Sequence, residues 1–231
     1  MISLKILSGG AAQGLITSLT PAFKAKTGFE LEGEFGAVGA IADKLLKGAP
    51  ADLIVLTAAL VAKLAGEKRV VPSSIADIAE VETALAVRSG DPRVKVTDAG
   101  DLRKALLAAD AIFVPDTNAS TAGIHVAKVL AQLGIADEVA ARLKVFPNGA
   151  TAMRQLAVSD AKRPVGCTQS TEIIATEGVE LTGSLPPGYE LKTMYTAGVT
   201  TNAAHAEQAQ ALIELLTGAG AGKARRRAGF V

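Results

Sequence analysis

Short apolar runs alternate with segments of helical periodicity along most of the chain. The first run covers residues 4–7, and a helix is predicted over 11–26 with Gly28 as its C-terminal cap. Apolar side chains recur through that helix at helical spacing, at Leu15, Ile16, Leu19 and Phe23. The pattern predicts a strand followed directly by an amphipathic helix.

The next segments repeat this arrangement. Residues 29–35 alternate apolar or small residues with glutamates, which predicts a half-buried strand. A helix opens at 36–39, residues 52–56 form a nearly continuous apolar run, and another helix reaches about residue 65. This β-α-β-α-β-α series predicts an open parallel sheet covered by helices.

A second series then begins. Asp98 is the expected cap of a helix, and 183–189 is expected to be a loop because it is rich in Gly and Pro. The further strands are expected at 81–88, 111–114, 144–146, 164–168 and 191–200, and the helices at 98–108, 120–133, 150–158, 203–216 and 222–228.

The two series predict an α/β fold with two lobes, each a mainly parallel sheet flanked by helices. We expect residues 1–80 and 196–231 in one lobe and residues 81–195 in the other. Ligands of open α/β sheets bind outside the carboxyl ends of the strands, so strand-to-helix loops should line a cleft.

Composition excludes several classes of function. The formal net charge of +1 argues against a nucleic-acid partner, and no uncharged apolar run is long enough for a membrane span. One Cys and two distant histidines, His125 and His205, argue against a disulfide framework and against a metal site built on them. We expect no metal and no cofactor, although an all-carboxylate metal site stays open.

The first residues of the sequence bear on the cellular location of the protein. No basic segment, apolar stretch and small-residue cleavage site precedes the strand at 4–7. The sequence as written is therefore expected in the cytoplasm. If an export signal was trimmed and a Met added, the same chain would be periplasmic.

Four strand-to-helix junctions are candidate binding loops: 8–12, 36–39, 116–123 and 167–171. Free backbone N–H groups and the helix dipole attract anions at such places, although each junction can also be a simple turn or cap. We expect all four to line one cleft. The candidate ligand-binding residues are Ser8, Gly9, Gly10, Ala11, Ala37, Val38, Gly39, Asn118, Ser120, Thr121, Thr168 and Gln169. None of the loops matches a nucleotide-binding motif.

The segment Gly-Ala-Pro-Ala-Asp-Leu at 48–53 resembles the corresponding segment of the molybdate-binding proteins of ABC transporters. The similarity continues at 121–124, 128–134, 163–166 and the C-terminal region, so it covers nearly the whole chain in order. It implies a type II periplasmic-binding fold with a small anion held in the hinge cleft. If the protein is exported, we expect an ABC transporter permease as its partner, and we expect the protein to be a monomer.

The departures from that family concern the ligand. Ala11 stands where the family has Ser, Ala37 begins a second loop that is Ser-rich in the family, and Gln169 replaces a Tyr. We therefore expect a solute-binding protein for an organic carboxylate more than for a compact tetrahedral oxyanion. The alternative is a cofactor-free isomerase of a di- or tricarboxylate, because aconitate isomerase resembles these binding proteins. No catalytic residue is assigned.

Several single residues have two interpretations each. Cys167 is a buried apolar side chain or a thiolate activated at a helix start. His125 is a packed histidine or a proton carrier, and Glu34 and Asp116 are solvated charges and caps or bases of an isomerase. The basic run at 225–227 is expected to be a cationic last helical turn.

Overall fold

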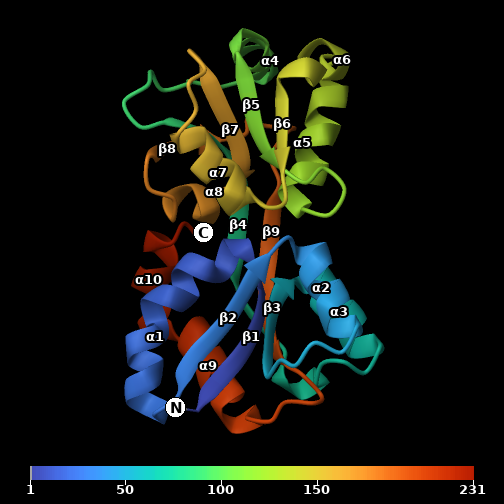
Figure 1. Cartoon of the computed structure of the whole chain (residues 1–231), viewed down its shortest axis with the longest axis vertical. Helices are drawn as coiled ribbons and strands as arrows, with labels where there is room; N and C mark the ends of the chain where they lie inside the picture. Colours follow the sequence, from blue (N-terminus) through green and yellow to red (C-terminus); the bar gives the residue numbers. More distant parts are fainter. Residues whose placement is uncertain (1) are drawn as a thin grey trace. The chain divides into compact units, whose positions relative to one another are not determined.

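The computed structural model describes residues 2–231, which form two compact units (Figure 1). Unit 1 consists of Met1–Val81 and Thr193–Val231, and unit 2 consists of Glu82–Lys192. The chain leaves unit 1 within strand β4, Ala76–Arg88, and returns to it at strand β9, Lys192–Val199. The C-terminal segment therefore completes the unit that the N-terminal segment begins.

Unit 1 is built on a sheet in the order β2-β1-β3-β9. Strand β1 pairs in parallel with β2 and β3, and β9 runs antiparallel to β3. The strand bounds are Ser3–Gly9 for β1, Glu30–Gly36 for β2 and Leu53–Thr57 for β3.

The helices of unit 1 cover both faces of its sheet (Figure 1). The connection from β1 to β2 and the one from β2 to β3 run in opposite directions along the sheet, so right-handed crossovers place α1 and α2 on opposite faces. Helix α1 packs against α9, and α2 against α3. The helices are α1 Gln13–Thr27, α2 Val38–Leu46, α3 Ala58–Gly66, α9 Ala206–Thr217 and α10 Gly222–Arg227, with 3₁₀ turns at Gly10–Ala12, Pro72–Ser74 and Ala219–Ala221.

Asp52, in the segment that resembles the molybdate-binding proteins, has a structural role. Its buried carboxylate accepts hydrogen bonds from the backbone N–H groups of Lys5 and His205, each at 2.9 Å. The residue thereby ties β1 to the start of α9 just before β3 begins. The resemblance at this position indicates the fold and not the ligand.

Unit 2 contains a mixed sheet. Strand β5 lies between β6 and β7 in parallel pairing, while β4 runs antiparallel to β7 and to β8. The bounds are β5 Ala111–Pro115, β6 Leu143–Phe146, β7 Pro164–Gln169 and β8 Val179–Ser184.

Alternation along the strands divides the interior of unit 2 into two hydrophobic clusters. Ile112 and Val114 of β5 belong to the cluster beneath α4 and α5, whereas Phe113 belongs to the cluster beneath α7 and α8. The helices are α4 Ala99–Ala108, α5 Thr121–Gln132, α6 Ala136–Val139, α7 Gly149–Ala157 and α8 Ser170–Ile174, with a 3₁₀ turn at Ala140–Arg142.

Most expected elements are present within a few residues, and the side chain of Asp98 accepts the N–H of Asp101 at 2.8 Å as the predicted cap. The prediction of a loop at 183–189 is wrong for its first two residues, because strand β8 includes Gly183 and Ser184. That strand carries small, exposed residues at this end and pairs across an irregularity between Leu85 and Ala86. Such a strand lacks the apolar alternation that sequence analysis depends on.

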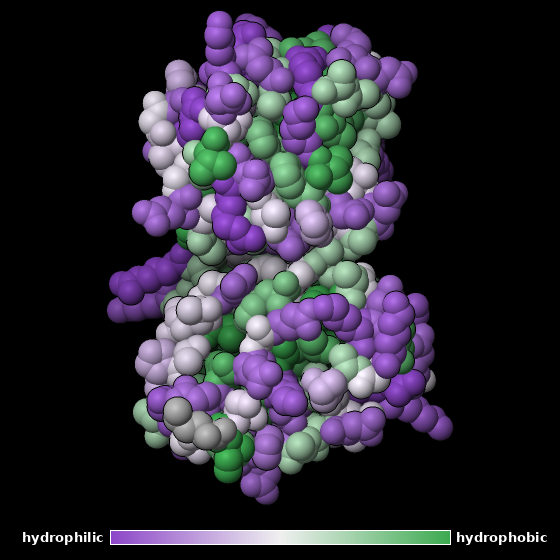
Figure 2. Space-filling model, viewed as in Figure 1, coloured by the Kyte–Doolittle hydropathy of each residue, from purple (hydrophilic) through white to green (hydrophobic). Residues whose placement is uncertain are grey.

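Polar and charged side chains are mixed with apolar ones over the face of each unit drawn in Figure 2. The large apolar side chains that are exposed include Ile124, Val145 and Val158. Among the described residues, no helix has the length and apolarity that crossing a membrane requires.

Candidate functional site

In unit 1, two of the predicted loops lie side by side at one edge of the sheet. Gly9 is paired with Gly36 at the carboxyl ends of β1 and β2, so loop 8–12 and loop 36–39 begin at the same level. A Cβ on Gly9 would lie 2.8 Å from Cγ1 of Val38, so a larger residue at this position would force one of the two to shift. The parallel strands therefore bring seven of the predicted residues to one edge: Ser8, Gly9, Gly10, Ala11, Ala37, Val38 and Gly39.

Three of the predicted binding loops, two in unit 1 and one in unit 2, lead into a helical segment that begins without a side-chain cap. Gly9, Ala37 and Ser120 precede the 3₁₀ turn at 10–12, α2 and α5, and none of the three gives a capping hydrogen bond from its side chain. Asp98 and Asn148 cap α4 and α7, whereas α1, α3, α8 and α9 also begin without a side-chain cap. First-turn N–H groups that no side chain occupies are suited to an anionic ligand.

Strand β9 adds two residues to the same edge of unit 1 that the sequence analysis missed. The ring of Tyr195 lies against Gly9, with Cε1 3.0 Å from an ideal Cβ there, and Tyr195 is paired with Thr57. Thr193, two residues earlier, is buried and its hydroxyl has no hydrogen-bond partner among the described residues.

In unit 2, the other two predicted loops follow β5 and β7. Asp116 accepts hydrogen bonds from the N–H groups of Asn118 at 2.7 Å and Ala119 at 3.0 Å, which shapes the turn before α5. Helix α5 then packs tightly on this turn, because a Cβ on Gly123 would lie 2.1 Å from the carbonyl oxygen of Asp116. Asn118, Ser120 and Thr121 are held in place by this packing.

Gln169, the last residue of β7, is buried with both amide atoms unpartnered among the described residues. The hydroxyl of Thr83, its register partner on β4, is equally buried and unpartnered. Gln169 is among the binding residues predicted from the sequence, whereas Thr83 is not. Thr168 faces the other side of the sheet, where its hydroxyl donates to Glu172 at 2.6 Å.

Glu172 is a buried carboxyl that meets the N-termini of two helices. The backbone N–H groups of Gly149, Ala150 and Gln169 donate to it in addition to Thr168. Burial raises the pKa of Glu172 above its ordinary value, and these hydrogen bonds offset part of that rise. The backbone N–H groups at the start of α7 therefore already donate to the carboxyl of Glu172, which lies within unit 2.

Residues 4–231 match the family of bacterial extracellular solute-binding proteins. The chain belongs to this family. The resemblance to solute-binding proteins of the molybdate-binding type is thereby confirmed for family and fold.

Solved structures of the family's fold include oxyanion-binding proteins. The periplasmic molybdate-binding protein of Azotobacter vinelandii is 21% identical, with a TM-score of 0.83 and 99% of each chain covered. The sulfate-binding protein of Mycobacterium tuberculosis is 21% identical with a TM-score of 0.78, covering 100% of this chain and 86% of the other. Aconitate isomerase of a Pseudomonas species is 24% identical over 99% of this chain and 87% of its own length.

The residues with two interpretations all have structural contacts. Burial raises the pKa of Cys167 to about 12, so it is the apolar side chain and not an activated thiolate. His125 Nε2 lies 2.7 Å from the carbonyl oxygen of Tyr189, and Glu34 forms an exposed ion pair with Lys44. The basic run at 225–227 forms the last turn of α10, as expected, and Arg225 also donates to the carbonyl oxygens of Leu216 and Gly218 at the end of α9.

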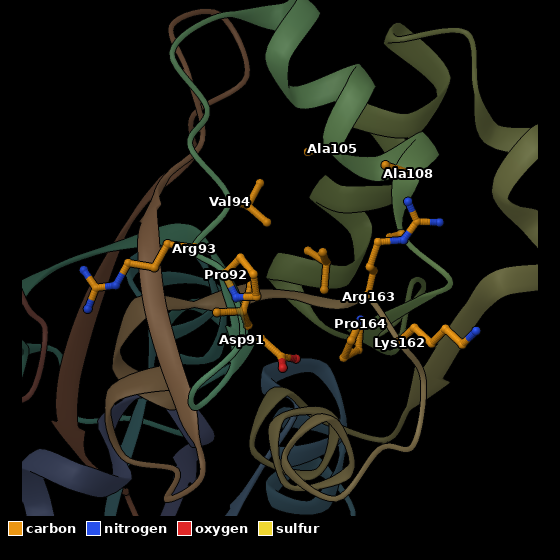
Figure 3. A pocket seen from close by; sticks show the side chains of 12 residues that line it. Asp91, Pro92, Arg93, Val94, Ala105, Ala108, Lys162, Arg163 and Pro164 are labelled. Atoms are coloured by element: carbon orange, nitrogen blue, oxygen red, sulfur yellow. The ribbon is translucent and has the colours of Figure 1, made fainter.

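A cavity of about 260 Å³ in unit 2 lies away from these loops (Figure 3). It is lined by apolar side chains such as Val87, Val94 and Val165, at the opposite end of β7 from Gln169. The charged ends of Arg93 and Lys162 extend to opposite sides, away from the other lining side chains (Figure 3). Among residues 2–231, no three His, Cys, Asp or Glu side chains are grouped as metal ligands.

Proposed function

We propose that this solute-binding protein captures a small anion with neutral donors and passes it to an ABC transporter permease. The observation that carries the proposal is that α2, α5 and the turn at 10–12 begin without side-chain caps at the carboxyl ends of parallel strands. The proposed anion-binding groups within each unit are the predicted loop residues other than Thr168, with Thr193 and Tyr195 added in unit 1 and Thr83 added in unit 2. Family membership and the oxyanion-binding proteins of the same fold support it.

An organic carboxylate is the favoured anion. Ala11 and Ala37 place buried methyl groups where related loops carry hydroxyls, and Gln169 presents a buried amide where related proteins have a tyrosine hydroxyl. Each ligand oxygen left unpaired costs about 1–3 kcal/mol. Two such losses weaken binding of a compact tetrahedral oxyanion by about two orders of magnitude.

Isothermal titration with molybdate, sulfate and a series of di- and tricarboxylates tests this proposal. We expect at least one carboxylate to bind with a Kd in the micromolar range or below and molybdate to bind at least about a hundredfold more weakly. Thermal unfolding gives an independent measure, because ligand at 100 times its Kd adds about 2.7 kcal/mol of stability. Submicromolar binding of molybdate would restore the oxyanion as the ligand.

A matched pair of variants tests the location of the site. Asn118→Ala changes an exposed side chain in a proposed binding loop, and Asn202→Ala changes an exposed side chain next to a cavity lined by residues such as Arg69 and Thr201. We expect a several-fold weaker Kd for the first variant and an unchanged Kd for the second. Equal effects of both would remove Asn118 from the site.

A second candidate function is isomerisation of an unsaturated carboxylate. It is favoured by the 24% identity to aconitate isomerase along 99% of the chain. Against it, Asp116 is engaged in the turn before α5, Glu34 is paired with Lys44 and His125 contacts a carbonyl. Incubation with trans-aconitate, followed by proton NMR, distinguishes the two: a binding protein returns it unchanged, and an isomerase produces the cis isomer.

Export from the cytoplasm follows from the same proposal, since the family consists of extracellular solute-binding proteins. A permease partner would be recognised by its effect on uptake. In cells that carry the transporter, deletion of this protein should abolish high-affinity uptake of the ligand and leave low-affinity uptake in place.

A further inference from the structure

Two neighbouring side chains of unit 2 are buried with unsatisfied polar atoms. Gln169 is 3% exposed and Thr83 is fully buried. Neither amide atom of Gln169 nor the hydroxyl of Thr83 has a hydrogen-bond partner among the described residues. Buried polar groups are paired in the great majority of native structures, so this pair requires an explanation.

The two side chains share one face of the sheet. Thr83 and Gln169 are register partners on the antiparallel strands β4 and β7, followed along these strands by the pair Leu85 and Cys167. Leu85 and Cys167 belong to the hydrophobic cluster beneath α5, and side chains two residues apart in a strand point the same way. Thr83 and Gln169 are therefore on the α5 face, with their Cβ atoms about 5 Å apart.

They also lie at the level where α5 begins. Phe113 of β5 is paired with Gly166 of β7, and continuing this parallel register by three residues places Asp116 level with Gln169. Asp116 opens the turn that leads to Ser120 and the uncapped first turn of α5. The unpartnered amide thus adjoins a proposed anion-binding loop, on the same side of the sheet.

The chemistry of an amide limits which ligand satisfies it. The Gln169 nitrogen only donates hydrogen bonds and its oxygen only accepts them, and rotating the amide by 180° exchanges the positions without changing that inventory. A fully ionised oxyanion or carboxylate only accepts, so it pairs with the nitrogen and leaves the oxygen unsatisfied. A ligand that carries a hydroxyl beside its carboxylate supplies both an acceptor and a donor.

We propose that the ligand is a hydroxycarboxylate, whose hydroxyl is recognised by Gln169 and Thr83. This inference rests on the proposed function, because it names the class of anion held at the same site. Thr83 is a further specificity-determining residue, since its hydroxyl donates or accepts as the ligand requires. A site built to pair with a hydroxyl discriminates strongly against the analogue that lacks it, because its own buried groups are then left unpaired.

Two matched pairs of probes test the proposal by isothermal titration of the full chain: malate against succinate, and citrate against tricarballylate. Within each pair the carboxylates are the same and only the hydroxyl differs. We expect the hydroxyl-bearing member of the better-binding pair to bind about tenfold or more tightly than its deoxy analogue. Equal affinity within both pairs would overturn the inference.

Variants connect the preference to the two side chains. Gln169→Met and Thr83→Val keep size and remove the polar atoms, and we expect each to reduce the preference for the hydroxyl to about threefold or less. Gln155→Met is the control, because Gln155 is exposed on α7. A preference that survives both site variants would assign the recognition to other residues.

The outcomes also separate this inference from the proposed function. If none of the carboxylates or oxyanions binds, the proposed function fails. If anions bind but the hydroxyl makes no difference, the proposed function stands and the hydroxycarboxylate inference fails. The comparison within each probe pair uses the unaltered protein, so it does not depend on whether a variant folds.

Discussion

Gly149 and Glu172 lie so close together that no side chain fits between them. A Cβ on Gly149 would lie 1.9 Å from Oε2 of Glu172 and 2.1 Å from the hydroxyl oxygen of Thr168. The first residue of α7 therefore has to be glycine for its backbone N–H to reach the buried carboxyl.

Replacing this glycine should destabilise unit 2. Gly149→Ala forces the carboxyl or the helix start to move, and we expect a loss of about 1–3 kcal/mol in the free energy of unfolding. Urea denaturation followed by circular dichroism measures it. Gly66→Ala is the control, because nothing lies within 4 Å of a Cβ there, and it should be neutral or stabilising. Equal stability of the two variants would contradict the packing described here.

The stability of the protein should depend on the ionisation of Glu172. Burial raises its pKa above the ordinary value of 4.5, so between 4.5 and the raised value the folded state holds a proton that the unfolded state has released. The free energy of unfolding contributed by this group is therefore fully present below pH 4.5 and is lost as pH rises through the folded-state pKa.

Glu172→Gln removes this titration. Urea denaturation over a pH series should show a decrease of stability above pH 4.5 in the unaltered protein and a flatter profile in the variant. Glu177→Gln, at an exposed position, should leave the profile unchanged. Parallel profiles for the unaltered protein and Glu172→Gln would mean that the carboxyl titrates at its ordinary pKa.

The single cysteine should be unreactive while the protein is folded. With a pKa of about 12 for Cys167, only about one molecule in ten thousand holds a thiolate at pH 8, and the side chain is buried. A chromogenic disulfide reagent should therefore label the folded protein on the timescale of unfolding and label one thiol at once in urea. Stoichiometric labelling within seconds under native conditions would contradict the burial of this thiol.

The close contact between Gly9 and Val38 at the edge of unit 1 can be tested with a second variant that relieves it. Gly9→Ala brings a methyl group within 2.8 Å of Val38 Cγ1 and 3.0 Å of Tyr195 Cε1, and we expect it to cost about 1–3 kcal/mol of stability. Val38→Ala removes the first of these contacts. In a double-mutant cycle, the cost of Gly9→Ala should be smaller in the Val38→Ala background than in the unaltered protein. Strictly additive effects would show that the two residues do not touch.

Much of the fold could be predicted from local sequence patterns, because helical periodicity and helix capping depend on residues that are close together in the chain. The apolar spacing of Leu15, Ile16 and Phe23 predicts α1, and Asp98 is the helix cap that its position and residue type indicate. Strand β8 was not predicted from the sequence because Gly183 and Ser184 at its end are small and exposed. A strand stabilised mainly by its pairing with β4 leaves little trace in its own side chains.

By itself, the sequence determined the order of the elements, the family and the loops rich in small residues, because periodicity, turn chemistry and motifs are properties of neighbouring residues. Only the tertiary structure decided which polar groups are left without partners. Thr83 and Gln169 are 86 positions apart in the chain and meet only because β4 pairs with β7. Thr168 differs from Gln169 by one position, yet the alternation of a strand turns its hydroxyl to the opposite face and to Glu172. Whether a polar group has a hydrogen-bond partner depends on such long-range pairings. The loops could therefore be predicted from the sequence, but which of their side chains are unpartnered could be known only from the structure.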